Sequence, residues 1–161
     1  MRSLSPVEAA LCIAIAGSVL GVGVPAFFRN LHASRLVESM DGLERIARAA
    51  AERAATEPVP TAYPASVRPT PAAVPAGVAL RDPPGSWDDP TWVSLGFGFS
   101  TPHRYSFEFE SEHRGRRARY RASARGDLDG DGQLSEFSVR GETSEGRAPV
   151  TFPLEMHREM E

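Results

Sequence analysis

One short acidic run has residue types and a spacing that suggest a defined chemistry. In GDLDGDGQLSEF, which begins at Gly126, the carboxylates of Asp127, Asp129 and Asp131 alternate, and Gly132 follows them. Alternation in a tight loop can turn three carboxylates toward one centre, and ligands that are all oxygen suit a hard cation such as Ca²⁺. The sequence therefore predicts a candidate calcium site in the loop at 126–132.

The second half of this run departs from the EF-hand pattern. That pattern requires a bidentate glutamate at its twelfth position, where Ser138 stands in this chain. The carbonyl of Gln133 and the side chains of Ser135 or Glu136 could complete the coordination shell in another geometry. The alternative is an Asp/Gly turn between two strands, in which these residues recur for their backbone conformations alone. Both interpretations are open.

The histidines do not form a catalytic pattern. The four of them, His32, His103, His113 and His157, are scattered, and the sequence has no H-E-x-x-H, G-x-S-x-G or P-loop motif. We therefore predict that the protein is not an enzyme. The formal net charge of -3 also argues against a general nucleic-acid binder, because no excess of positive charge is available to neutralise phosphates.

Alternating residues predict the strands that hold the acidic loop. The runs RYSFEFE at 104–110 and RRARYRASA at 116–124 place apolar residues on one face and charges on the other. A hairpin between them would pair Phe109 with Ala118 and Glu110 with Arg117. With further strands at 134–140 and near 149–154, we expect an antiparallel β-domain at 92–161.

Two helical segments and a linker precede this domain. Residues 9–28 are uncharged, which predicts a membrane span, with a secretory signal peptide as the alternative. Residues 29–56 continue as an amphipathic helix, whose apolar face we expect to cover the sheet. That face consists of Leu36, Met40, Leu43 and Ala47. Nine of the 14 prolines lie between Pro58 and Pro90, so the segment 57–91 is predicted to be a surface linker.

The N-terminal run LSPVEAALCIAIAGSVLGVGVPAFF, residues 4–28, resembles the start of type IV pilins and pseudopilins. The resemblance implies a leader at 1–3, which a prepilin peptidase removes between Ser3 and Leu4 before the new terminus is methylated. The family expects glycine immediately before this cleavage point. In the family, the glutamate that Glu8 matches pairs with the terminal amine of a neighbouring subunit.

The same resemblance implies roles for two further residues and a fold. Gly17 matches a family glycine and Pro25 the helix-breaking proline of the family. The implied fold class is α+β: a long N-terminal helix packed on a small antiparallel sheet. Residues 4–28 of this helix would be its transmembrane and filament-core half, and 29–56 its amphipathic half.

The expected function is that of a minor pilin or pseudopilin in a type IV pilus or type II secretion-like filament. The resemblance implies as partners other pilin subunits, the inner-membrane assembly machinery and the prepilin peptidase. It implies a single pass through the bacterial inner membrane with the C-terminal domain in the periplasm, followed by assembly into a cell-surface or periplasmic filament. The alternative function is a membrane-anchored periplasmic binding module, with calcium as its cofactor, that does not polymerise.

Overall fold

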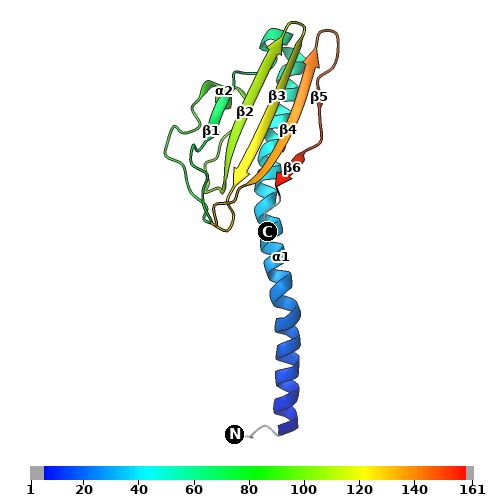
Figure 1. Ribbon diagram of the computed structural model, residues 1–161, viewed down its shortest axis with the longest axis vertical. Coiled ribbons are helices and arrows are strands. Elements are labelled where there is room, and N and C mark those ends of the chain that lie inside the picture. Colours follow the sequence, from blue (N-terminus) through cyan, green and yellow to red (C-terminus); the bar gives the residue numbers. More distant parts are fainter. Residues whose placement is uncertain (1–5, 159–161) are drawn as a thin grey trace. The chain divides into compact units, whose positions relative to one another are not determined.

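The computed structural model describes residues 6–158, which fall into two compact units. The boundary between the units lies at Leu36 and Val37, inside helix α1 (Pro6–Thr56) (Figure 1). The side chains described before this boundary are those of 6, 7, 10, 14, 15, 17–19, 21, 22 and 36. Each unit is described by itself.

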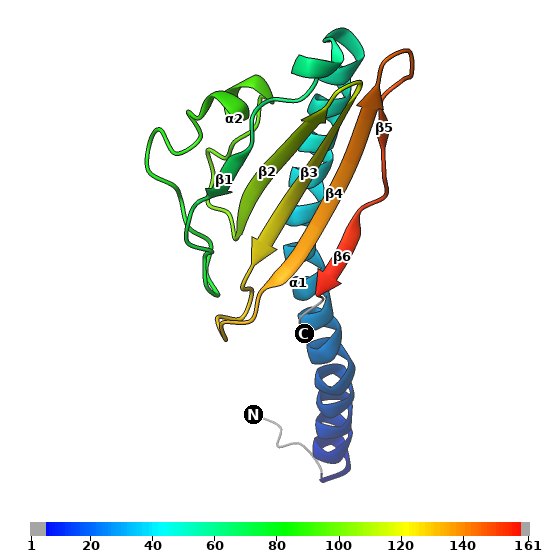
Figure 2. The same ribbon diagram turned by 45° about the horizontal axis from the view of Figure 1, so that its top comes forward.

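The second unit is built on an antiparallel sheet of six strands. Its elements after α1 are η1 (Val59–Thr61), β1 (Val67–Thr70), α2 (Pro90–Ser94), β2 (Tyr105–Arg114), β3 (Arg117–Gly126), β4 (Ser135–Ser144), β5 (Val150–Thr151) and β6 (Glu155–Arg158). The strand order is β1-β2-β3-β4-β5, and β6 also pairs with β4. Residues 37–56 of α1 run along one face of the sheet, behind β2, β3 and β4 in Figures 1 and 2.

The apolar residues of the alternating runs form the buried face of the sheet. Phe107 and Phe109 of β2 are fully buried, as are Leu43 and Ile46 of α1. This confirms which side of each strand faces the core. Because burying one large apolar side chain contributes about 1.5–3 kcal/mol, these residues account for much of the stability of the unit.

The helix face that covers the sheet differs from the predicted one. Leu43 and Ala47 are buried as expected, but Met40 is 41% exposed. Gly42 lies against the sheet instead, and a Cβ atom there would stand 2.5 Å from Cε1 of Phe107. The phenylalanine ring therefore packs directly on the helix backbone, and this contact sets which face of the helix is turned inward.

The β2–β3 hairpin has a different register from the predicted one. Phe109 is opposite Ala122 and not Ala118, and Glu110 is opposite Arg121. The strands are joined by a tight turn at Gly115, whose φ of +58° suits the primed turns of short hairpins. The shorter turn moves the pairing by an even number of residues, so every side chain keeps its predicted face.

The predicted membrane span at 9–28 is contradicted. Within the residues that the structure describes, no helix is both long enough and apolar enough to cross a membrane. The single-pass location in the bacterial inner membrane and the periplasmic placement of the C-terminal domain depended on this span, and they are wrong with it. A span needs about 20 predominantly apolar residues. Most of the side chains described in this range are small: Ala10, Ala14, Gly17, Ser18 and Gly21.

The predicted α+β fold class, with a transmembrane half in its long helix, is therefore also wrong. The globular unit is mostly β, with residues 37–56 and the short α2 as its main helical parts. Its apolar face is covered in part by the proline-rich segment, because Ala62 and Tyr63 of this segment are buried with the helix residues. This segment, predicted to be a surface linker, also supplies the edge strand β1.

Candidate functional site

Three carboxylates come together in the loop between β3 and β4. One oxygen atom from each of Asp127, Asp129 and Asp131 lies within 4.8 Å of the other two. Oxygen ligands of Ca²⁺ stand at about 2.3–2.6 Å from the ion, so two ligands of one ion lie at most about 5 Å apart. The spacing of the three aspartates is therefore compatible with the binding of one calcium ion.

Backbone donors within the loop orient these carboxylates. Asp127, which is 5% exposed, accepts the N–H of Gly130 at 2.7 Å on Oδ1 and the N–H of Gly132 at 3.1 Å on Oδ2. Both glycines have a positive φ, at +82° and +86°, which side chains rarely tolerate. Asp129 accepts the N–H of Asp131 at 3.1 Å. Each carboxylate oxygen has further lone pairs, so these hydrogen bonds leave acceptor sites for a cation.

Gln133 stabilises the ionised form of the third aspartate. Its backbone N–H lies 2.7 Å from Oδ1 of Asp131, and its side-chain Nε2 lies 2.8 Å from Oδ2. These hydrogen bonds, the backbone one first, lower the pKa of Asp131. An Asp/Gly turn of this kind is also stabilised by its own hydrogen bonds, so it can form without an ion.

The other predicted ligands lie in β4. Glu136 stands on the outer face of the sheet, where Oε1 is 3.0 Å from Arg121 and Oε2 is 3.8 Å from Arg125. Ser135 is buried as the first residue of β4, opposite Gly126. The structure thus brings the three aspartates and Gln133 together, whereas Glu136 is engaged by arginines.

The acidic loop also contacts the proline-rich segment. The N–H of Gly77 donates to the carbonyl of Asp127 at 2.8 Å, and Ala76 forms an isolated β-bridge with Asp127. A Cβ atom at Gly77 would meet the carbonyl oxygen of Asp129 at 3.4 Å. Any ion held by this loop would therefore also stabilise the contact with the proline-rich segment.

The outer face of the sheet carries rows of opposite charges. Arg119 pairs with Glu142 at 3.2 Å, and Arg125 pairs with Glu108 at 3.2 Å. A hollow of about 730 Å³ lies over this face and includes Phe152 in its lining. Because both charge signs are present and largely paired, the face offers no single-sign field to attract a ligand, and each exposed pair contributes only about 0–1 kcal/mol.

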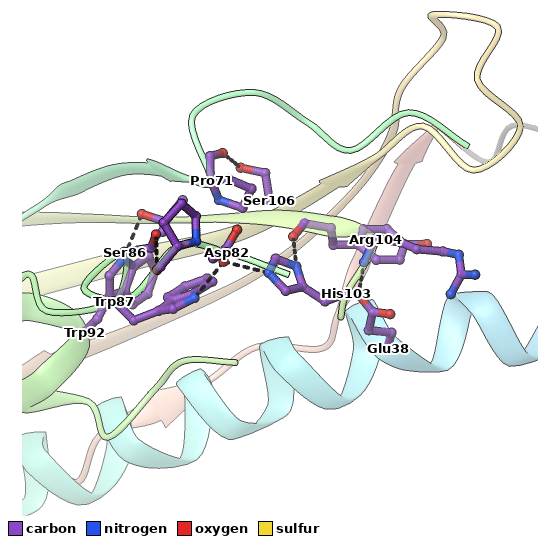
Figure 3. Close-up of polar contacts among 12 residues, drawn as sticks. Glu38, Pro71, Asp82, Ser86, Trp87, Trp92, His103, Arg104 and Ser106 are labelled. Carbon is purple, nitrogen blue, oxygen red and sulfur yellow. Dashed lines mark hydrogen bonds and ion pairs between the residues drawn. The ribbon is translucent and has the colours of Figure 1, made fainter. Parts of the chain in front are cut away.

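A buried polar cluster lies where the loop after β1 meets the start of β2 (Figure 3). Nε2 of His103 is 2.7 Å from Oδ2 of Asp82, and the two side chains are only 1% and 6% exposed. Nδ1 of His103 is 2.8 Å from the carbonyl oxygen of Tyr105. The indole N–H of Trp87 donates to the same Asp82 oxygen at 2.8 Å.

Aromatic rings and helix α1 enclose this cluster. Phe99 stacks on His103 with ring centroids 4.6 Å apart, and the guanidinium of Arg45 lies 5.1 Å from the centroid of the Phe97 ring. Glu38 of α1 accepts the backbone N–H of Arg104 at 2.6 Å. Sequence reasoning missed this cluster because no motif links Asp82 to His103, which are 21 residues apart.

The tyrosine side chains are further buried polar groups. Burial raises the pKa of Tyr63, Tyr105 and Tyr120, so all three stay neutral well into the alkaline range. Tyr63 packs edge-on against Tyr120 with ring centroids 4.9 Å apart. These rings therefore act as apolar core residues.

The residues that the pilin resemblance assigns to processing and assembly are only partly described. Ser3 and Leu4 lie outside the described residues, and so do the side chains of Glu8 and Pro25. Helix α1 is continuous through Pro25. Gly17 is exposed, and apart from its chain neighbours and its own helix backbone no described atom lies within 4 Å of the position that a Cβ atom would take.

Comparison of the chain with protein-family models, with curated proteins and with solved structures finds no match. The resemblance to type IV pilins therefore depends on motifs of the sequence itself: the N-terminal run and, in the globular part, W-x-x-L-G-F, R-Y-S-F-E-F and G-D-L-D-G-D-G.

Proposed function

We propose that the protein is a structural, non-enzymatic subunit of a pilin-like filament, in which the first part of α1 packs against the same helix of neighbouring copies. The observation that carries this proposal is the exposure of branched apolar side chains on α1. Val7 is 77% exposed, Ile15 57%, Val19 64% and Val22 73%. Clustered exposed apolar side chains are typical of interaction surfaces.

The distribution of these residues around the helix favours an open assembly over a closed dimer. At about 100° per residue, Ile15, Val19 and Val22 fall within a sector of about 60°, which we call the ridge. A second sector of similar width, the groove, is formed by small residues: Ala10, Ala14, Gly17 and Gly21. A ridge that packs into the groove of the next copy uses two different surfaces, and such heterologous contacts propagate into filaments when the rotation between copies does not close a ring.

A pair of valines on the two units provides the test. Val19 of the ridge and Val93 of α2 are both 64% exposed, so an aspartate at either position adds the same charge at the same accessibility. We expect the purified full-length chain to form filaments in electron micrographs and large species in sedimentation velocity. Val19→Asp should abolish assembly because a charge enters the packed helices, and Val93→Asp should leave it intact.

Two results would contradict the proposal. One is a wild-type chain that stays monomeric at every accessible concentration. The other is assembly of Val19→Asp at the concentration at which the wild type assembles.

Calcium binding by the acidic loop is the second candidate function, and the observation that favours it is the 4.8 Å grouping of the three carboxylates. Calcium at 100 times its dissociation constant would stabilise the folded unit by about 2.7 kcal/mol. We expect the melting temperature to rise by several degrees in calcium relative to chelator. Asp129→Asn should remove this rise, whereas Asp41→Asn, an exposed aspartate on α1, should keep it. An unchanged melting temperature of the wild type in millimolar calcium would exclude the site.

A further inference from the structure

The hydrogen bonds of His103 determine how many protons it shares with Asp82. The carbonyl oxygen of Tyr105 only accepts, so the contact at 2.8 Å requires a hydrogen on Nδ1 of His103. The indole N–H of Trp87 donates to Oδ2 of Asp82 and supplies no hydrogen for the remaining contact. The Nε2–Oδ2 contact at 2.7 Å therefore needs one additional hydrogen, carried by the histidine or by the carboxyl group.

Without this hydrogen the contact would be repulsive. A neutral imidazole with its hydrogen on Nδ1 would point the Nε2 lone pair at the carboxylate oxygen, and both side chains are nearly inaccessible to water. Leaving such polar atoms buried and unpaired is costly. The closed arrangement therefore requires one proton shared between the two side chains.

The His103–Asp82 pair joins the two ends of the segment that lies between these residues. Leu80 and His103 exchange two backbone hydrogen bonds, each 2.9 Å long, next to the side-chain contact. The residues between Asp82 and His103 include Trp87, Phe97 and Phe99, whose rings pack on one another and on Phe107. Separation of the pair would therefore loosen an aromatic cover of the core.

Charged residues contact this corner from α1 and adjoin the pair in sequence. Glu38 accepts the Arg104 N–H and Arg45 lies over the Phe97 ring, while Arg81 and Arg104 are the sequence neighbours of Asp82 and His103. Tyr105, which follows in β2, is kept neutral by burial, which raises its pKa. None of these residue types ordinarily changes its charge near neutral pH, as histidine does.

We propose that His103 and Asp82 share one proton and form a pH-dependent latch, which holds the segment 83–89 and its Trp87 side chain closed and releases them as pH rises, while α2 stays attached to Ala65 and Thr70. Opening breaks the Nε2–Oδ2 hydrogen bond and transfers the shared proton to water, leaving a neutral imidazole and a carboxylate. The latch does not depend on the filament proposal, because all its residues lie in the globular unit.

The two tryptophans give an internally controlled test in the full-length protein. The indole N–H of Trp87 donates to Asp82, whereas that of Trp92 donates to the uncharged hydroxyl of Thr70 at 3.0 Å. Indole hydrogen exchange, corrected for intrinsic rates, should show Trp87 protection falling by up to tenfold per pH unit between about pH 6.5 and 8.5, as one released proton requires. Trp92 protection should change little. Equal pH dependence of the two indoles, or none, would overturn the latch.

Variants and spectroscopy keep the proposal testable if the latch variants fold poorly. His103→Gln and Asp82→Asn should abolish the pH dependence at Trp87, whereas His113→Gln, a change at an exposed histidine, should preserve it. In the wild type at about pH 6, below the range in which the latch opens, ¹⁵N spectra should show a shared proton: either both ring nitrogens of His103 protonated, or a neutral ring beside a protonated Asp82. A neutral ring beside an ionised Asp82 would contradict the proposal directly.

Discussion

Two stretches of α1 use similar residues in opposite ways. In the first unit, Ile15 is 57% exposed, while in the second unit Ile46 of the same helix is fully buried. The glycines differ in the same sense: Gly17 has open space around it, and Gly42 is covered by the ring of Phe107. Residue type alone therefore does not say what a helical position contributes, because the surface opposite it decides.

The largest expected effect separates the two isoleucines. Ile46→Ala should lower the free energy of unfolding of the globular unit by about 2–5 kcal/mol, because it leaves a cavity in a packed core. Ile15→Ala should change it by less than about 0.5 kcal/mol, as is usual for an exposed position. Chemical denaturation followed by tryptophan fluorescence measures both, since Trp87 and Trp92 lie in the globular unit. Equal losses of unfolding free energy in the two variants would contradict the difference between Ile46 and Ile15.

A smaller effect, of opposite sign at the two sites, is expected for the glycines. Gly42→Ala should destabilise the globular unit by about 1–3 kcal/mol, because the added methyl group must displace Phe107. Gly17→Ala should increase the helix content of the first unit, because alanine favours a helix by about 1 kcal/mol over glycine. Circular dichroism and denaturation together test both signs. A Gly42→Ala variant as stable as the wild type would show that the ring contact can relax.

The smallest effect is confined to alkaline pH and to the globular unit. Because burial raises the pKa of Tyr63, Tyr105 and Tyr120, these side chains stay protonated in the folded unit, whereas they ionise above about pH 10 when it unfolds. Their stabilising contribution is thus complete below about pH 10 and is lost as pH rises further. Phenolate absorbance should appear together with unfolding of the sheet. Ionisation of all three tyrosines before the tryptophan fluorescence changes would contradict their burial.

Patterns of local origin could be predicted from the sequence. The alternation in β2 and β3 identified the buried side chains, because the side-chain period of a strand is fixed by its geometry. The hairpin register was not recovered, since it depends on a turn at Gly115 that periodicity does not specify. Proline content indicated the end of the helix but gave no sign that β1 would pair with β2.

The same distinction between local patterns and tertiary contacts applies to the candidate site. The spacing of Asp127, Asp129 and Asp131 brought three carboxylates together because they occupy one short loop. Glu136 is close in sequence but belongs to β4, where cross-strand arginines engage it. The His103–Asp82 pair arises from tertiary packing between distant segments, which a single sequence does not reveal.

The proline-rich segment is fastened to the sheet at several separate points. Ser66 accepts the N–H of Ser111 at 2.9 Å, Gly77 donates to Asp127, and Leu80 pairs with His103. These hydrogen bonds divide the segment into short stretches. A short stretch gains little conformational entropy when it is released. A protease that cut one stretch would therefore leave both new ends in place, so a nicked chain should keep its fold and behave as a noncovalent complex of its own fragments.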